Sequence, residues 1–226
     1  DPGLTTLSDV NGLYSFVSIG TNGNYILKVS KSGHWDSYHS LNTTPFQATT
    51  DIQDVTKTVS SYSNSYIAEI ASQGGVPVDS SKGIITGRVT GGDGTPQHCA
   101  KLSIRDAVGN DLSAAGAVIV YVAGSRGSCE DENDTSQTST NGLFFIYNVP
   151  PGEVFVSYFT KVTLGSSGAV NSSSGGMIVP AFPGVVFVQN ITNTGTYTPQ
   201  DLSGSIIDGA SSAPVSGAQL TFLGIT

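Results

Sequence analysis

Two cysteines and three histidines are the residues whose chemistry would be most specific in this sequence. Cys99 and Cys129 are the only cysteines among the 226 residues, and the histidines are His34, His39 and His98. A zinc site built on two thiolates needs further ligands, and these histidines are not spaced to supply them. A single disulfide in a secreted protein is the simpler interpretation, and two buried free thiols are the alternative.

An acidic run follows the second cysteine. Ca²⁺ favours clustered carboxylate oxygens of this kind. The spacing differs from the Asp-x-Asp-x-Asp-Gly pattern of a calcium loop, and an acidic run is usually a solvated surface. We therefore predict no cofactor and keep calcium as the alternative, with these ligands: Glu130, Asp131, Glu132 and Asp134.

Asparagines in the pattern Asn-x-Ser/Thr accept N-linked glycans in a competent host. Such sequons also arise by chance in a chain rich in serine and threonine. The four in this sequence fall in segments that we expect to be loops or strand ends. The candidate glycosylation sites are Asn42, Asn133, Asn171 and Asn190.

Trp35 and Tyr38 could form an aromatic platform for a sugar, with His34 and His39 beside them. The plainer interpretation is that this cluster covers the core at the edge of a β-sandwich. The Gly-x-Ser-x-Gly pattern of a nucleophile elbow does not occur, and we find no catalytic set of nucleophile, base and acid. The sequence therefore predicts a protein that is not an enzyme.

Composition favours an extracellular protein. Charged residues make up 12% of the chain, against about 25% in a typical domain, so Ser, Thr, Asn and Gly must supply the surface polarity. The net charge of −8 argues against nucleic acid, whose phosphates need clustered Lys and Arg. No apolar run is long enough for a membrane span. The chain opens at Asp1 without methionine or a signal peptide, which favours a processed or excised segment.

The elements that would position these residues are short strands separated by turns. The clearest lies in 141–158, where Asn-Gly predicts a tight turn before a strand. Along that strand Phe144 and Ile146 would point to one face, and Phe145 and Tyr147 to the other.

Pro150-Pro151-Gly152 would then break the strand, and residues 154–158 resume the alternation. The stretch therefore predicts a β-hairpin. The same design occurs at 11–29, where we expect a first hairpin from Leu13 to Lys31 that ends at Gly33-His34-Trp35. Two copies of one design indicate an internal repeat.

One segment has helical spacing instead. Its apolar residues recur every three to four positions, Asn64 or Ser65 could cap its start, and Gly74-Gly75 would end it. We expect one short helix near 64–73, followed by a linker at 76–82. Further strands are predicted at 83–90, 102–104, 117–122 and 185–188, with a flexible Gly- and Ser-rich loop at 165–176.

These strand and turn motifs resemble the carboxypeptidase regulatory-like domain. The resemblance rests on Pro214-Val215-Ser216-Gly217-Ala218, on Asp9-Val10-Asn11-Gly12-Leu13-Tyr14-Ser15-Phe16, and on the segments 83–89 and 141–145. It implies a prealbumin-like sandwich close to the Cna-B type surface repeats, and it leaves the function open. Such repeats can carry a Lys–Asn isopeptide bond, for which the conceivable donors are Lys28, Lys82 and Lys101.

The fold expected from these observations is all-β, with tandem immunoglobulin-like (prealbumin-like) sandwiches and one short helix. Residues 1–78 would hold the C-terminal part of one module together with the helix and linker. Residues 83–198 would form a complete module with the disulfide-bearing insertion. Residues 201–226 would be the N-terminal part of a third module.

The two end fragments would complete one sandwich if residues 201–226 met residues 1–35 of a neighbouring copy. Neither fragment is expected to bury its inner face alone. The sequence therefore predicts a structural subunit or repeat of an extracellular filament, sheath or surface stalk, assembled head to tail. The residues expected at this contact are Leu202, Ile206, Leu220, Phe222, Tyr14 and Phe16.

Other interpretations stay open. The chain could be cut at arbitrary points, with both ends packed or disordered. A carbohydrate-binding or adhesion module using the Trp35 region is the main alternative function, with a glycan as partner. An accessory domain of a secreted peptidase is a third.

Overall fold

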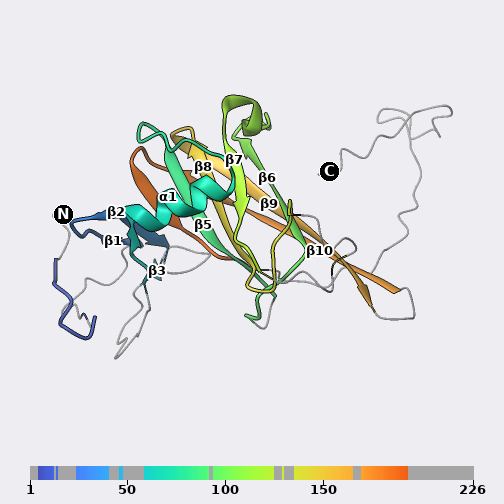
Figure 1. Cartoon of the computed structure of the whole chain (residues 1–226), viewed down its shortest axis with the longest axis horizontal. Coiled ribbons are helices and arrows are strands. Elements are labelled where there is room, and N and C mark those ends of the chain that lie inside the picture. Colours follow the sequence, from blue (N-terminus) through green and yellow to red (C-terminus); the bar gives the residue numbers. More distant parts are fainter. Residues whose placement is uncertain are drawn as a thin grey trace, which may run out of the picture. The chain divides into compact units, whose positions relative to one another are not determined.

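Figure 1 shows the chain as a computed structural model. The structure describes residues 5–12, 14, 24–40, 46–47, 59–91, 94–124, 129, 135–164 and 169–192. The chain divides into two units, Asp1–Thr196 and Tyr197–Thr226, and every described residue belongs to the first. Strands dominate the described residues, which contain one α-helix, so the expected all-β class is confirmed. The finer expectation of tandem immunoglobulin-like sandwiches stays a prediction.

The larger sheet has nine strands of mixed direction. They are β1 (Asn24–Val29), β2 (His34–Ser40), β3 (Phe46–Gln47), β4 (Tyr62–Ser63), β5 (Gly83–Thr90), β7 (Val118–Tyr121), β8 (Leu143–Val149), β11 (Val185–Val188) and β12 (Ile191–Thr192). The order is β3-β1-β2-β11-β5-β8-β7, with β12 paired to β5 and β4 paired to β2. The strands β11 and β12 run parallel to their partners, and the other pairs are antiparallel.

The smaller sheet has three antiparallel strands in the order β10-β9-β6. They are β6 (Ala100–Asp106), β9 (Gly152–Leu164) and β10 (Ala169–Ala181). A 3-10 helix, η1 (Leu112–Ala115), lies between β6 and β7 in the sequence. The flexible loop predicted at 165–176 is therefore wrong for residues 169–176, which belong to β10.

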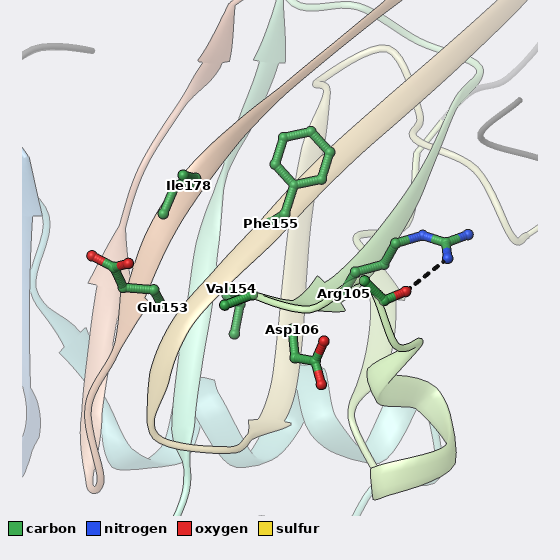
Figure 2. Close-up of a pocket in the computed structure, with 8 residues that line it drawn as sticks. Arg105, Asp106, Glu153, Val154, Phe155 and Ile178 are labelled. Atoms are coloured by element: carbon green, nitrogen blue, oxygen red, sulfur yellow. Dashed lines mark hydrogen bonds between the residues drawn. The ribbon is translucent and has the colours of Figure 1, made fainter. Parts of the chain in front are cut away.

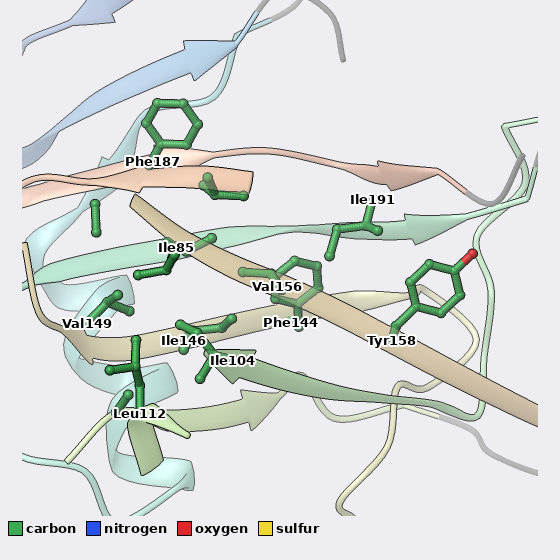
Figure 3. Close-up of a cluster of buried hydrophobic side chains, with 14 of the residues drawn as sticks. Ile85, Ile104, Leu112, Phe144, Ile146, Val149, Val156, Tyr158, Phe187 and Ile191 are labelled. Atoms are coloured by element: carbon green, nitrogen blue, oxygen red, sulfur yellow. The ribbon is translucent and has the colours of Figure 1, made fainter. Parts of the chain in front are cut away.

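The two sheets enclose the main core, shown in Figure 3. Phe144 and Ile146 of β8 meet Val156 and Tyr158 of β9 there. Each of these four side chains is at least 98% removed from solvent. The predicted facing of the alternating residues in both strands is therefore correct.

A second core lies on the other face of the larger sheet, under helix α1 (Asn64–Gln73). Phe145 and Tyr147 of β8 pack there against Ile67 and Ile70 of the helix. The Tyr147 hydroxyl donates to the backbone oxygen of Ile67 at 2.9 Å. Because β8 is covered on both faces, its sequence is apolar almost throughout rather than only at alternate positions.

The predicted hairpin at 141–158 is wrong in its pairing, although both of its strands exist. β8 pairs with β5 and β7, whereas β9 pairs with β6 and β10. Pro150 and Pro151 between them have no N–H for a ladder. The chain thus leaves one sheet at Val149 and enters the other at Gly152, which makes this turn a link between the two layers.

Helix α1 has the predicted bounds but a different cap. The side chain of Ser63, not Asn64 or Ser65, accepts the N–H of Tyr66 at 3.2 Å. Gly74 and Gly75 end the helix as expected, and Gly75 has a φ of 65°.

The strand pairing near the N-terminus differs from the predicted hairpin at 13–31. β1 pairs with β2 around a turn in which Gly33 has a φ of 76°. His34 and Trp35 therefore begin a strand instead of ending the hairpin. Of residues 13–23, Tyr14 alone lies within the described residues.

The expected module boundary after residue 78 lies inside one packed unit. β2 pairs with β11, so residues on both sides of the boundary share the larger sheet. Asn148 of β8 also holds the linker: its side-chain oxygen accepts from Asp79 N, and its side-chain nitrogen donates to Pro77 O, each at 2.9 Å. The described parts of 1–78 and 83–198 are therefore not packed as separate modules.

Gly87 sits where two backbones approach closely. β11 and β12 pair with successive parts of β5, and Gln189 between them donates its N–H to Thr86 O at 2.8 Å. The side-chain oxygen of Asn190 accepts from Arg88 N at 3.0 Å. A Cβ at position 87 would overlap the Gln189 carbonyl, so no larger residue fits.

We expect Gly87→Ala to destabilise the fold by about 2–3 kcal/mol, because the added methyl group must displace a hydrogen-bonded backbone segment. Urea denaturation followed by circular dichroism measures this. Arg88→Ala is the matched control, since Arg88 is exposed on the same strand and its loss should change stability by no more than about 0.5 kcal/mol. Equal stability of Gly87→Ala and the wild type would contradict the close approach.

Candidate functional site

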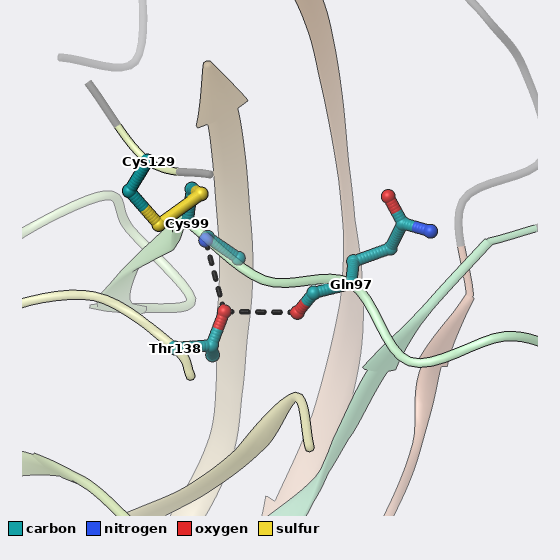
Figure 4. Close-up of a disulfide and its surroundings, with 5 residues drawn as sticks. Gln97, Cys99, Cys129 and Thr138 are labelled. Atoms are coloured by element: carbon teal, nitrogen blue, oxygen red, sulfur yellow. Dashed lines mark hydrogen bonds between the residues drawn. A yellow bond between two sulfur atoms is a disulfide. The ribbon is translucent and has the colours of Figure 1, made fainter. Parts of the chain in front are cut away.

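The disulfide predicted from the two cysteines is present. Cys99 and Cys129 are bonded, with Cα atoms 5.3 Å apart. Figure 4 shows Thr138 beside them: its hydroxyl donates to Gln97 O and accepts from Ala100 N, each at 2.9 Å. Thr138 is fully buried. The disulfide and this threonine together hold the start of β6.

Trp35 and Tyr38, predicted as a shared sugar platform, lie on opposite faces of β2. Trp35 packs against the core under the helix, and Tyr38 packs against the core between the sheets. The Tyr38 ring centroid is 5.3 Å from that of Phe182. A separation of three residues along a strand reverses the side-chain direction. The two rings therefore do not form one surface, and each covers part of a core.

Trp35 instead has aromatic neighbours that the sequence analysis did not identify. Tyr62 of β4 is its register partner, and the Tyr62 and Tyr66 rings stack with centroids 6.2 Å apart. Both tyrosines also contact Phe145 edge-on. We call Trp35, Tyr62 and Tyr66 the aromatic row. All three are half-buried. The strand that brings Tyr62 to Trp35 is two residues long, too short to give a periodic sequence signal.

His39 is a buried titratable group on β2, with 5% of its surface exposed. Its Nε2 lies 2.7 Å from Ser60 O and 3.3 Å from the Ser37 hydroxyl, which itself donates to Ser60 O. Burial lowers the pKa of the His39 imidazole, and the contact with Ser60 O partly opposes that shift. The contacts of His39 and Ser37 with Ser60 O connect the segment that precedes β4 to strand β2.

The lysines suggested as isopeptide donors are not buried. Lys28 forms an ion pair with Asp36 at 2.7 Å, which raises the pKa of Lys28 and lowers that of Asp36. Lys82 donates to Ala115 O at 3.0 Å, and Lys101 is exposed. A lysine becomes a nucleophile when it is desolvated, so these surroundings do not favour an isopeptide bond.

Two of the four candidate glycosylation sites are described. Asn190 is exposed between β11 and β12, whereas Asn171 lies within β10 rather than in a loop. Tyr14, expected at the contact between copies, is half-buried, and burial raises the pKa of its hydroxyl. The other predicted residues lie outside the described part of the chain: Asn42, Asn133, Glu130, Asp131, Glu132, Asp134, Phe16, Leu202, Ile206, Leu220 and Phe222.

Metal-binding and membrane-crossing groups can be assessed for the described residues alone. Within them, no group of three or more His, Cys, Asp or Glu side chains is placed to hold a metal ion. No helix in the same residues is long and apolar enough to cross a membrane.

The outer face of the smaller sheet carries an apolar surface that the sequence analysis missed. Phe155 of β9 is paired with Arg105 on one side and Ile178 on the other, so all three share this face. Phe159 lies further along β9 and is 44% exposed, and Ile178 is 66% exposed. We call the following residues the outer patch: Lys101, Arg105, Glu153, Phe155, Phe159 and Ile178.

Two glycines of β10 make room for aromatic rings of β9. A Cβ at Gly176 would lie 2.6 Å from the tip of the Phe155 ring, and one at Gly175 would lie 2.9 Å from the Tyr158 ring. Phe155 therefore lies over β10 on the outer face, and Tyr158 lies over it on the inner face. Ser103 and Ser157 are the next register pair on the outer face, and their hydroxyls share a hydrogen bond of 2.8 Å. Ser157 is almost fully buried, so this pair of short side chains adds no exposed bulk between Phe155 and Phe159.

Charged groups at one end of the outer patch are well anchored. Arg105 donates from Nη1 to Gly109 O at 3.1 Å. The neighbouring Asp106 accepts from the side chain and backbone of Asn110, and these bonds lower the pKa of its carboxyl. Figure 2 shows Arg105 beside Phe155 and Glu153 two residues before it on β9. All three line a shallow pocket of about 480 Å³. An apolar surface that is flanked by opposite charges is suited to binding a partner surface with complementary charges.

Comparisons with known proteins do not add to this geometry. No protein-family model matches the chain, and no curated protein matches it. The resemblance to the carboxypeptidase regulatory-like domain therefore stays an expectation from the sequence motifs.

Replacing both cysteines by serine should lower the free energy of unfolding by about 3–4 kcal/mol, because the open chain regains the entropy of a loop that spans 30 residues. Urea denaturation of the variant measures the loss. The reduced wild type is the control and should match the variant. A midpoint equal to that of the oxidised wild type would contradict a stabilising role.

Stability should fall as the pH drops from about 7 to about 5, with His39 as a main cause. The folded-state pKa of His39 is lowered below its ordinary value of about 6.5, so the unfolded state binds the proton first. The contribution of neutral His39 is complete above about pH 6.5 and is lost progressively as the pH falls towards the folded pKa. Denaturation across this range measures it.

His39→Gln supplies the comparison, because glutamine keeps a donor near Ser60 O and does not titrate. Its stability should vary less with pH in the same range. Hydrogen bonds lower the pKa of the Asp79, Asp106 and Asp111 carboxyls below their ordinary value, so these groups titrate outside this window. Equal slopes for the wild type and the variant would contradict the role of His39.

Proposed function

We propose that this chain is a structural subunit or repeat of an extracellular filament, sheath or surface stalk, built from copies of itself joined head to tail. The observation that carries the proposal is the order of the strand motifs in the sequence. Residues 201–226 hold the front half of one sandwich pattern, and residues 1–35 hold its back half. A neighbouring copy would complete this pattern by strand addition.

Strand pairing restricts where the proposed contact could form. β1 already pairs with β2 and β3 of its own chain, so residues 24–29 do not offer a free strand edge. The segment that would receive residues 201–226 then lies before residue 24 and includes Tyr14 and Phe16. The disulfide and the low content of charged residues support an extracellular setting.

Substitutions in the C-terminal strand pattern test the head-to-tail contact. Leu220 and Phe222 alternate with Thr221, so in a strand Thr221 would face away from the partner. We expect the wild type and Thr221→Asp to form end-to-end assemblies in electron micrographs, and Leu220→Asp and Phe222→Asp to stay monomeric in sedimentation velocity.

All four proteins should unfold at similar urea concentrations, because the proposal places these positions between copies and not inside the fold of one copy. A wild type that stays monomeric at all accessible concentrations would overturn the proposal. Equal assembly of Leu220→Asp and Thr221→Asp would overturn the split-sandwich contact.

Glycan binding is the second candidate, and the aromatic row favours it. Stacked tyrosines beside a tryptophan resemble the flat platforms on which sugar rings pack. Glycan-array binding should be lost in Trp35→Ala and kept in Tyr38→Ala, because Tyr38 lies on the other face of β2. Absence of binding by the wild type would remove this candidate.

A further inference from the structure

The outer patch breaks the pattern expected for a sheet face that borders water. Outward positions on such a face are usually polar. Here the middle strand β9 presents Phe155 and Phe159 outward, and Ile178 of β10 lies beside Phe155. Phe159 is 44% exposed and Ile178 is 66% exposed. Neighbouring apolar side chains of this kind on a flat sheet mark a contact surface.

The short serine side chains between the rings of the outer patch leave room for another sheet. Gly176 lets the Phe155 ring lie down over β10, and the hydrogen-bonded pair of Ser103 and Ser157 adds no bulk. Sheets that pack face to face lie about 10 Å apart, which short and flattened side chains allow. A second flat sheet therefore fits the outer patch better than a helix or a pointed loop does.

The charges of the outer patch fit a second copy of this chain as the partner. Arg105 lies beside Phe155 on β6, and Glu153 lies two residues before Phe155 on β9 (Figure 2). A two-fold axis in the plane of contact, running over the Phe155 ring and diagonally between the two charged positions, exchanges the places of Arg105 and Glu153. Each Arg105 then faces Glu153 of the second copy, and the two Phe155 rings meet at the axis. An isologous contact requires a patch that complements itself in this way.

The size of the outer patch indicates how such a contact would act. The three strands, over the part of β9 whose side chains are described, present on the order of 400 Å² at the usual strand spacing and rise. A stable pair usually buries about 800 Å² on each partner. One such contact is therefore weak, and it becomes effective where many copies are already joined in a row.

We propose that the outer patch is a lateral contact between copies, in which two smaller sheets stack face to face about a two-fold axis. This inference deepens the proposed function and rests on it, because joined copies supply the repetition that a weak contact needs. The head-to-tail contact sets the length of an assembly, and the outer patch joins neighbouring rows into a sheath or bundle.

Charge exchange tests the two-fold geometry. In Arg105→Glu both charged positions next to Phe155 are negative, and in Glu153→Arg both are positive, so each variant repels its own copies there. Lys101, opposite Phe159, is unchanged in both variants. We expect each to weaken lateral association at least tenfold in sedimentation velocity. The double variant should recover to within about threefold of the wild type, because reversed pairs are again complementary.

A mixture of the two single variants gives an independent readout. Each variant alone should stay apart, whereas an equimolar mixture should associate, since one copy carries two acidic and the other two basic positions. Arg88→Glu and Glu69→Arg are the matched controls. They make the same charge changes on β5 and α1, and they should associate as the wild type does.

The outcomes separate this contact from the head-to-tail one. Electron micrographs should show that Arg105→Glu forms single filaments that do not bundle. A double variant as weak as the single variants, a mixture that fails to associate, or a wild type without lateral association would each overturn the inference. Lateral pairs that obey the charge rules without any end-to-end filaments would support the outer patch and overturn the proposed function.

Discussion

Burial of β8 on both faces is the constraint on which the rest of the structure depends. Phe144 and Ile146 face the smaller sheet, and Phe145 and Tyr147 face the helix. A strand that is apolar on both sides can slip by one residue with little loss of hydrophobic burial. Polar contacts must therefore set its register.

Three such contacts act on β8. Tyr147 donates to the helix backbone, Asn148 binds both ends of the linker turn, and the Thr86 hydroxyl donates to Phe144 O at 2.8 Å. Each would be lost if the strand shifted by one position, and each would leave a buried polar group without its partner. These bonds thus give the sandwich one arrangement, while the apolar side chains supply most of the stability.

Local features of this fold could be predicted from the sequence, and the pairing of strands could not. The alternation in β8, the bounds of the helix and the disulfide each depend on residues close together or on a count of cysteines. Pro150-Pro151-Gly152 has the composition of a hairpin turn, but whether the chain returns to the same sheet depends on distant strands. Gly175-Gly176 resembles a flexible loop until the rings of Phe155 and Tyr158 are seen lying over it.

The same limit applies to the candidate surfaces. Trp35 and Tyr38 are close in sequence, yet strand geometry separates them, while Tyr62 joins Trp35 from 27 positions further along. The outer patch needs the register of three strands before Arg105, Phe155 and Ile178 become neighbours. Because the aromatic row belongs to the helix side of the larger sheet and the outer patch to the smaller sheet, a ligand on one surface does not block the other.

The parallel pairing of β2 with β11 has a mechanical consequence. The two strands join residues 36–39 to residues 185–188, and they point the same way. Suppose that β2 is pulled from its N-terminal end and β11 from its C-terminal end. The hydrogen bonds between the two strands are then loaded in shear, so they share the force instead of opening one after another. A sandwich with this joint in its load path resists stretching better than one held by an antiparallel pair that can unzip.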